Sequence, residues 1–195
     1  MKRLLVLSIV LSSVTASAQQ VELAPIIGYT TPVTLDRTTQ GVDELKIDDG
    51  ITWGVRGTYL LTPRLGLEAM WTYQPTEMRM STPGGTAVLF EMSITQFYGN
   101  VAYEFGNSSA RLRPFVFGGA GATFFDAPDL TTEAKLTWDA GGGMKWFLQQ
   151  HLGIEGRVRY KPTQLSESDE LCGPFDFCQG TLRSVDVTTA FLVRF

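Results

Sequence analysis

The residues most capable of chemistry in this sequence are charged side chains that recur at every second position. Glu155, Arg157 and Arg159 follow this spacing, and Asp139 lies an even number of positions before Lys145. In an extended strand such residues point to the same side. The full set comprises Arg56, Glu68, Asp139, Lys145, Glu155, Arg157, Arg159, Asp186 and Arg194. We expect these mixed charges to pair in a closed interior, and a narrow, gated ion path is the alternative.

Catalytic and metal chemistry find little support in the residue types. The chain has one histidine, His151, and no serine or acid accompanies it at a motif-like spacing. This pattern disfavours a Ser/His hydrolase or a lipid A-modifying acyltransferase. Two cysteines and one distant histidine do not form a zinc-binding pattern either. We therefore expect no enzyme, no metal site and no cofactor.

Cys172 and Cys178 enclose a short segment that contains Phe175 and Phe177. Both cysteines follow an expected export signal, so they would enter an oxidising compartment. We predict a disulfide that holds a small turn, with two unpaired thiols as the alternative. Exposed aromatic residues on such a turn would suit adhesion or lipid contact, or they would pack against the rim of the fold.

The runs that carry the charged residues alternate apolar and polar residues with a period of two, which predicts β-strands. One face of these runs is rich in valine, isoleucine and aromatic residues. The expected strands span residues 21–30, 51–61, 65–74, 92–105, 112–125, 135–147, 151–161 and 182–195. The run at 112–125 shows no clear polar face, because Phe115 to Ala122 is a stretch of aromatic residues, valine, glycine and alanine. We leave its orientation open.

The connections between these runs alternate in length. Residues 62–64, 106–111 and 148–150 are short connections, whereas 31–50, 75–91, 126–134 and 162–181 are long. This alternation, with both chain ends on the short-turn side, is typical of an antiparallel up-and-down transmembrane β-barrel with eight strands. We expect the long loops outside the cell and both mature termini in the periplasm.

The apolar faces of the runs also favour a membrane barrel. No run of helical period is present to cover them, and closure with the polar face inward satisfies every backbone group in lipid. Trp53, Trp71, Tyr73, Tyr103, Phe105 and Trp146 lie near strand ends, as in the aromatic girdles of such barrels. A soluble β-sandwich also alternates, and it is the alternative fold.

The first eighteen residues resemble a secretory signal peptide. Lys2 and Arg3 precede an apolar run, and Ala16 and Ala18 form an A-x-A cleavage pattern. We therefore expect a signal peptide at 1–18 and one barrel domain at 19–195. Loss of the two basic residues changes the formal net charge from −4 to −6, which disfavours a nucleic-acid partner.

Acidic residues gather in the long connections. The set includes Asp36, Asp43, Glu44, Asp48, Asp49, Glu167, Asp169, Glu170 and Asp176. Surface solubility is the simplest role. The alternatives are divalent cations that bridge lipopolysaccharide, or a basic partner, although no spacing matches a calcium-loop motif.

The chain ends with Phe191, Val193 and Phe195 on one face and a terminal aromatic residue. This ending resembles the C-terminal signal of bacterial outer-membrane barrels, and the whole mature chain resembles the small porin-like family typified by the OmpA transmembrane domain, OmpX and the opacity proteins. The resemblance implies outer-membrane lipid, lipopolysaccharide, the barrel assembly machinery and periplasmic chaperones as partners. It implies a role in envelope structure or surface interaction through the long loops, with a small channel or transporter for ions or hydrophobic molecules as the alternative.

Overall fold

The computed structural model describes residues 21–35, 44–82, 85–107, 110–126, 133–165 and 180–195. The strands in these ranges are β1 (Val21–Thr30), β2 (Val33–Leu35), β3 (Glu44–Ile47), β4 (Gly50–Leu60), β5 (Leu65–Thr82), β6 (Gly85–Glu104), β7 (Leu112–Asp126), β8 (Glu133–Phe147), β9 (Leu152–Leu165) and β10 (Gly180–Arg194). Within these ranges, no helix is long and apolar enough to cross a membrane.

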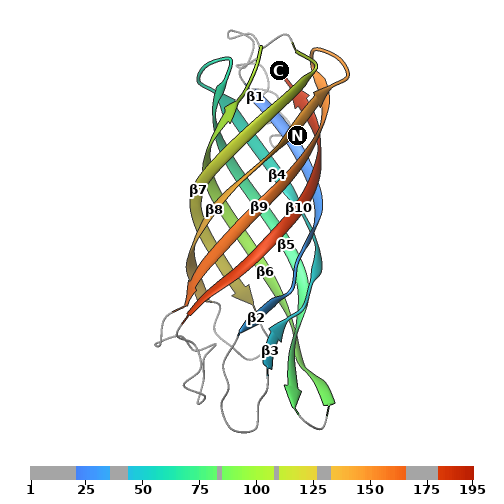
Figure 1. Ribbon diagram of the computed structural model, residues 1–195, viewed down its shortest axis with the longest axis vertical. Coiled ribbons are helices and arrows are strands. Elements are labelled where there is room, and N and C mark those ends of the chain that lie inside the picture. Colours follow the sequence, from blue (N-terminus) through green and yellow to red (C-terminus); the bar gives the residue numbers. More distant parts are fainter. Residues whose placement is uncertain (1–20, 36–43, 83–84, 108–109, 127–132, 166–179) are drawn as a thin grey trace, which may run out of the picture.

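Eight of the strands form a closed barrel in which every neighbour is antiparallel (Figure 1). The ring runs β1, β4, β5, β6, β7, β8, β9 and β10, and β10 returns to β1 through pairs such as Glu22 with Arg194. Phe195 N also donates a hydrogen bond to Val21 O at 2.9 Å. The all-β, eight-stranded up-and-down barrel expected from the sequence is confirmed.

The expectation of a connection at residues 75–91 is wrong, because β5 continues to Thr82 and β6 begins at Gly85. The two strands pair from Leu65 opposite Tyr103 to Thr82 opposite Gly85. Regular alternation marks a strand only where one face must be apolar. Beyond the expected lipid zone neither face has to be apolar, so this part of the hairpin lacks the pattern. For the same reason the sequence did not predict β2 and β3, which lie within the expected connection at residues 31–50.

A small sheet extends beyond the barrel at the end that carries the long connections (Figure 1). β2 pairs with β3, β3 pairs with the outer part of β5, and β5 pairs with β6. We call β2, β3, residues 76–82 of β5 and residues 85–92 of β6 the projecting sheet. β1 begins at Val21 and the chain ends at Phe195 at the opposite end of the barrel, near the short turns (Figure 1).

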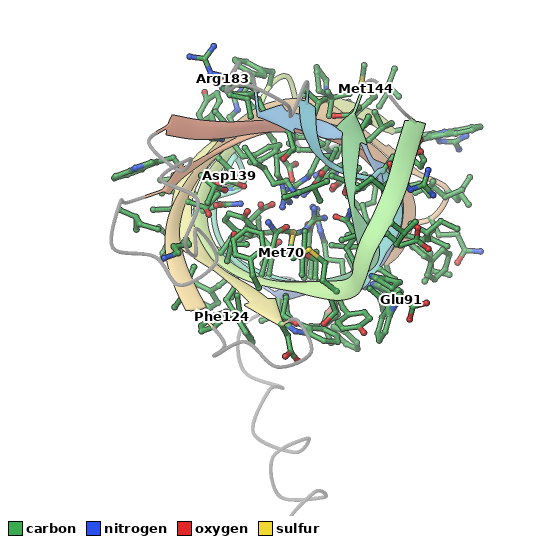
Figure 2. All side chains as sticks on the ribbon, turned by 90° about the horizontal axis from the view of Figure 1, so that it is seen from below. Met70, Glu91, Phe124, Asp139, Met144 and Arg183 are labelled. Carbon is green, nitrogen blue, oxygen red and sulfur yellow. The ribbon has the colours of Figure 1, made fainter. Side chains whose placement is uncertain are left out.

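The two faces of the barrel wall differ sharply in polarity. Trp53, Val116, Trp138 and Val158 are about half exposed on the outer face. Viewed from the long-loop end, Asp139 and Met70 point inward, whereas Phe124, Met144 and Glu91 lie outside the wall (Figure 2). An apolar exterior around a polar interior is the arrangement of a lipid-embedded barrel.

The orientation of β7, which the sequence left open, follows from its burial pattern. Arg113, Phe115, Phe117, Thr123 and Phe125 are buried and face the interior. The sequence pattern of this strand was ambiguous because Phe115 and Phe117 occupy inward positions. A polar interior predicts polar side chains at those positions.

Candidate functional site

The centre of the lumen holds a closed set of four ion-paired side chains. Arg56 donates two hydrogen bonds to Glu155 at 2.6 and 2.7 Å, and Arg157 donates two to Glu68 at 2.8 and 2.9 Å. Arg157 Nε also donates to Glu155 Oε1 at 3.0 Å, which joins the two pairs. All four side chains are at most 1% exposed. Bidentate pairs of this kind are the strongest geometry available to buried charges.

A second layer lies nearer the short-turn end. Lys145 Nζ donates to Glu22 Oε2 and to Glu104 Oε1, each at 2.6 Å. Arg194 also donates to Glu22, and Arg113 donates to Glu104 at 3.4 Å. Five strands contribute these five charges, so the layer ties β1, β6, β7, β8 and β10 together across the lumen.

A third layer lies on the long-loop side of the centre. Arg159 Nε is 3.3 Å from Asp139 Oδ2, and Lys161 Nζ is 2.8 Å from Asp186 Oδ2. Arg159 also contacts Met70 Sδ at 2.7 Å. Among the described residues, several buried polar atoms of this layer have no hydrogen-bond partner, including Oδ1 of both Asp139 and Asp186. This layer is therefore less completely paired than the centre.

A belt of threonine and glutamine side chains covers the charged layers on the long-loop side. Thr30 bonds Thr52 at 2.7 Å, and Thr123 bonds Thr137 at 2.7 Å. Gln96 connects the belt to the third layer, since its Oε1 accepts from Lys161 Nζ at 2.8 Å. The hydroxyl and amide hydrogen bonds cross neighbouring strands in two series, one of Thr30, Thr52 and Gln74 and the other of Thr72, Gln96, Thr123, Thr137 and Thr163.

Aromatic rings fill the space between the charged groups. Arg157 Cζ lies 4.1 Å from the ring centre of Phe117 and 4.9 Å from that of Phe115. Arg113 and Arg194 lie at 4.4 and 4.5 Å from the ring of Phe147. Stacked guanidinium groups gain attraction from the ring faces in addition to their ion pairs. The lumen is thus packed by rings and paired charges together.

All nine lumen residues predicted from the sequence lie inside the barrel, and each is at most 7% exposed. The sequence reasoning omitted Arg113 from this set, because the inner face of its strand was undecided. It also omitted the inward aromatic residues Tyr98, Phe115, Phe117 and Phe147. The available signal was the even spacing of these residues from polar inward positions, such as Phe115 from Arg113 and Phe147 from Lys145.

The other predicted residues are distributed as follows. His151 lies at a short turn, where its Nδ1 is 3.2 Å from Arg194 O, and no described carboxylate or hydroxyl joins it in a catalytic arrangement. Phe191 and Phe195 are about half exposed on the outer face. Cys172 and Cys178 lie outside the described residues. Within the described part of the chain, no group of three His, Cys, Asp or Glu residues could hold a metal ion.

An acidic hollow of about 760 Å³ lies at the base of the projecting sheet. It is lined by Asp48, Asp49, Tyr73, Pro75, Thr76, Glu77, Arg79, Glu91, Met92, Ser93 and Asp126. Arg79 lies 2.9 Å from Asp48 and donates to Glu77 at 3.1 Å. The hydrogen bond to Glu77 and the charge of Asp48 raise the pKa of the Arg79 guanidinium. Five carboxylates thus face one basic group.

The fold has counterparts among solved structures. Neisserial surface protein A shares 9% identity with this chain at a TM-score of 0.62, over 90% of this chain and 97% of that chain. OprG from Pseudomonas aeruginosa shares 13% identity at 0.59, over 92% and 98% of the two chains. Ail of Yersinia pestis, in complex with the heparin analogue sucrose octasulfate, shares 14% identity at 0.50, over 90% and 99%. These similarities show a common fold.

No curated protein sequence matches this chain. The profile of the family described as outer membrane protein beta-barrel domain matches residues 4–188, which is most of its length. This match agrees with the closed barrel, its apolar exterior and its charged interior. The chain therefore belongs to the outer membrane protein beta-barrel domain family and is a bacterial outer-membrane β-barrel protein.

Proposed function

We propose that this protein is a non-enzymatic outer-membrane protein that acts in surface interaction through the projecting sheet. The observation that carries the proposal is the contrast between the two ends of the molecule. The lumen is packed with paired charges, whereas the long-loop end extends a sheet beyond the barrel wall. A packed interior serves stability, and a protruding sheet offers surface to a partner.

The proposed topology places the long-loop end outside the cell and the short turns in the periplasm. It rests on the proposed export of the chain by residues 1–18 and on a mature barrel of residues 19–195. In this view, chaperones and the barrel assembly machinery act on the periplasmic side, and the apolar outer face contacts lipid and lipopolysaccharide. The rule that barrels have short periplasmic turns and long external loops supports this orientation.

Accessibility in intact cells tests the topology. In a background in which Cys172 and Cys178 are replaced by serine, Val88→Cys lies on the projecting sheet and Gln149→Cys lies in a short turn. A membrane-impermeant maleimide should label the first variant in intact cells and the second only after the outer membrane is opened. Labelling of Gln149→Cys alone in intact cells would invert the topology and remove the basis for a surface role.

A channel is the second function that the sequence allowed, and the lumen geometry argues against it. The central side chains Arg56, Glu68, Glu155 and Arg157 span the interior through hydrogen bonds of 2.6 to 3.0 Å. An eight-stranded barrel has an interior that its own side chains can fill. Ion flow would require these pairs to separate, so we do not propose transport as the main role.

Shortening the projecting sheet tests the proposed function directly. Replacement of residues 78–90 by an Asn-Gly turn removes the tip of the hairpin and leaves the barrel strands intact. Cells that display the shortened protein should lose adhesion to immobilised polypeptide surfaces, while the outer-membrane level and the heat-dependent gel shift stay unchanged. Undiminished adhesion by the shortened protein would overturn the proposal.

A further inference from the structure

The part of β6 that extends beyond the barrel has one side on which no described residue pairs with it. β7 pairs with β6 only from Ser93, opposite Asp126, to Glu104, opposite Phe115. Residues 85–92 pair with β5 on one side, and no described residue pairs with them on the other. The alternate N–H and C=O groups of this edge are a template for another extended chain. Val88 on this edge is 52% exposed.

The acidic hollow lies at the inner end of this same edge. Asp126, Ser93 and Glu91 line it beside the last described pair of β6 and β7, which is Ser93 with Asp126. Glu77 and Glu91 are direct register partners on β5 and β6, an arrangement in which like charges oppose each other. Within the described residues, Arg79 forms ion pairs with Asp48 and Glu77, whereas Glu91 and Asp126 form none.

We propose that the free edge of β6 and the acidic hollow together form a docking site for a basic, extended polypeptide segment. This inference rests on the proposed surface function and names its partner class. The bound segment would continue the line of β7 beside residues 85–92 of β6 and donate its backbone hydrogen bonds to that edge. Its side chains on the outer face would reach the carboxylates of the hollow.

The negative charge of the hollow and the spacing of its carboxylates disfavour three other ligands at this site: a metal ion, a second copy of this chain and a polyanion. A metal ion needs several ligands converging on one point, and no described cluster of acidic residues meets that requirement. A second copy of this chain would bring Glu91 and Asp126 against the same acidic surface. A polyanion, such as the phosphates of lipopolysaccharide or a sulfated sugar, would meet five carboxylates and one guanidinium.

The strand geometry also fixes the pattern of the partner sequence. Side chains of an added strand alternate between the two faces, so only every second residue lies on the face of Glu77 and Glu91. The partner should therefore carry lysine or arginine at alternate positions. The intervening residues would follow the opposite face of the sheet, on which Met92 is buried. A peptide with its basic residues in one block would place half of them away from the hollow.

Peptides of equal composition test the proposal on the full-length barrel in lipid vesicles. The probe is a blocked, fluorescent peptide of about eight residues that alternates lysine and valine, a typical strand length. One control groups all the lysines at one end, and a second control has methylated backbone nitrogens that cannot pair with an edge. We expect the alternating peptide to bind at least about tenfold more tightly than either control. Equal affinity of all three peptides would overturn the proposal.

Three variants separate the contributions. Glu91→Gln with Asp126→Asn should weaken binding of the alternating peptide by about fivefold, as expected for two exposed ion pairs. Arg79→Gln is the matched control, because it removes a positive charge from the hollow. This variant should strengthen binding of the basic peptide. Replacement of residues 78–90 by the short turn should abolish binding. Unchanged affinity in the double variant, or binding of the peptide by the shortened barrel, would overturn the proposal.

The outcomes also distinguish this inference from the proposed function. If the shortened protein loses cell adhesion but the alternating peptide shows no preference for the full barrel, the surface role stands and the basic partner is wrong. If the shortened protein keeps adhesion, the surface function itself fails, whatever the peptides show.

Discussion

The ring of Phe117 lies over the bare backbone of Gly141, its register partner on the neighbouring strand. A Cβ atom built on Gly141 would stand 2.7 Å from Cζ of Phe117. Phe115 and Gly143 repeat this relationship two residues along, at 2.8 Å. Inward glycines on β8 therefore seat the inward rings of β7, and the same rings stack under Arg157. The packing of the charged centre therefore depends on glycine at these two positions of β8, where any side chain would collide with a ring.

Gly141→Ala should lower the free energy of unfolding by about 1–3 kcal/mol, because the added methyl group would overlap the ring and the backbone of β9. Urea-induced unfolding in lipid vesicles measures this change. Gly156→Ala is the matched control, since a Cβ there meets nothing within 4 Å. That variant should leave stability unchanged or raise it by about 0.5–1 kcal/mol. Equal effects of the two substitutions would contradict the seating role.

Arg56→Met should cost about 3–5 kcal/mol of stability, because it leaves the buried carboxylate of Glu155 without its bidentate partner. Glu155→Met should have a similar cost, and the double variant should cost less than the sum of the two. Urea unfolding of all four proteins completes the cycle. Thr58→Val is the neutral control, because it removes a buried hydroxyl that has no hydrogen-bond partner among the described residues. Simple additivity would contradict the coupling of the pair.

The unmodified barrel should show no steady ion current in planar bilayers, because paired side chains occupy its centre. The double variant Glu68→Ala with Arg157→Ala lacks one bidentate ion pair and has an unchanged net charge. This variant should conduct a measurable ion current. The heat-dependent gel shift verifies that the double variant is still a barrel. Steady current from the unmodified protein would favour the channel function instead.

Phe195→Ser should reduce the amount of protein in the outer membrane severalfold if the terminal aromatic residue is an assembly signal. The side chain is 53% exposed, and the closing backbone bond from Phe195 N to Val21 O does not require the ring. Refolding of purified protein in detergent should therefore be unaffected. Phe105→Ser, at an exposed aromatic residue in a short turn, is the control. Equal losses for the two variants would mean that the ring acts through lipid contact alone.

The barrel was predictable because lipid imposes a rule on every residue of its wall. Trp53, Val55 and Tyr59 on β4 had to face outward together, and Arg56 then had to face inward. The same parity placed Glu155, Arg157 and Arg159 in the lumen before any contact was known. The partners of Arg56 and Arg157 were not predictable, because each meets its carboxylate across the interior and not along a strand pair.

The projecting sheet could not be predicted by the same reasoning. Residues 75–82 and 85–91 form strands through backbone pairing with each other, and the membrane places no demand on their side chains. The acidic hollow was foreseen only as a gathering of carboxylates such as Asp48 and Asp49. Its inclusion of Glu91 and Asp126 depends on the register that places Asp126 opposite Ser93, and no local pattern determines this register.

The bond between Glu22 and Arg194 joins residues that are 172 positions apart, at the seam where the first and last strands meet. This contact exists only when the final strand docks in the correct register. A slip of one residue in the last strand would turn Arg194 toward lipid and leave the buried Glu22 with one cationic partner fewer. The pairing at the seam therefore favours closure in the correct register, because a misaligned barrel would be less stable.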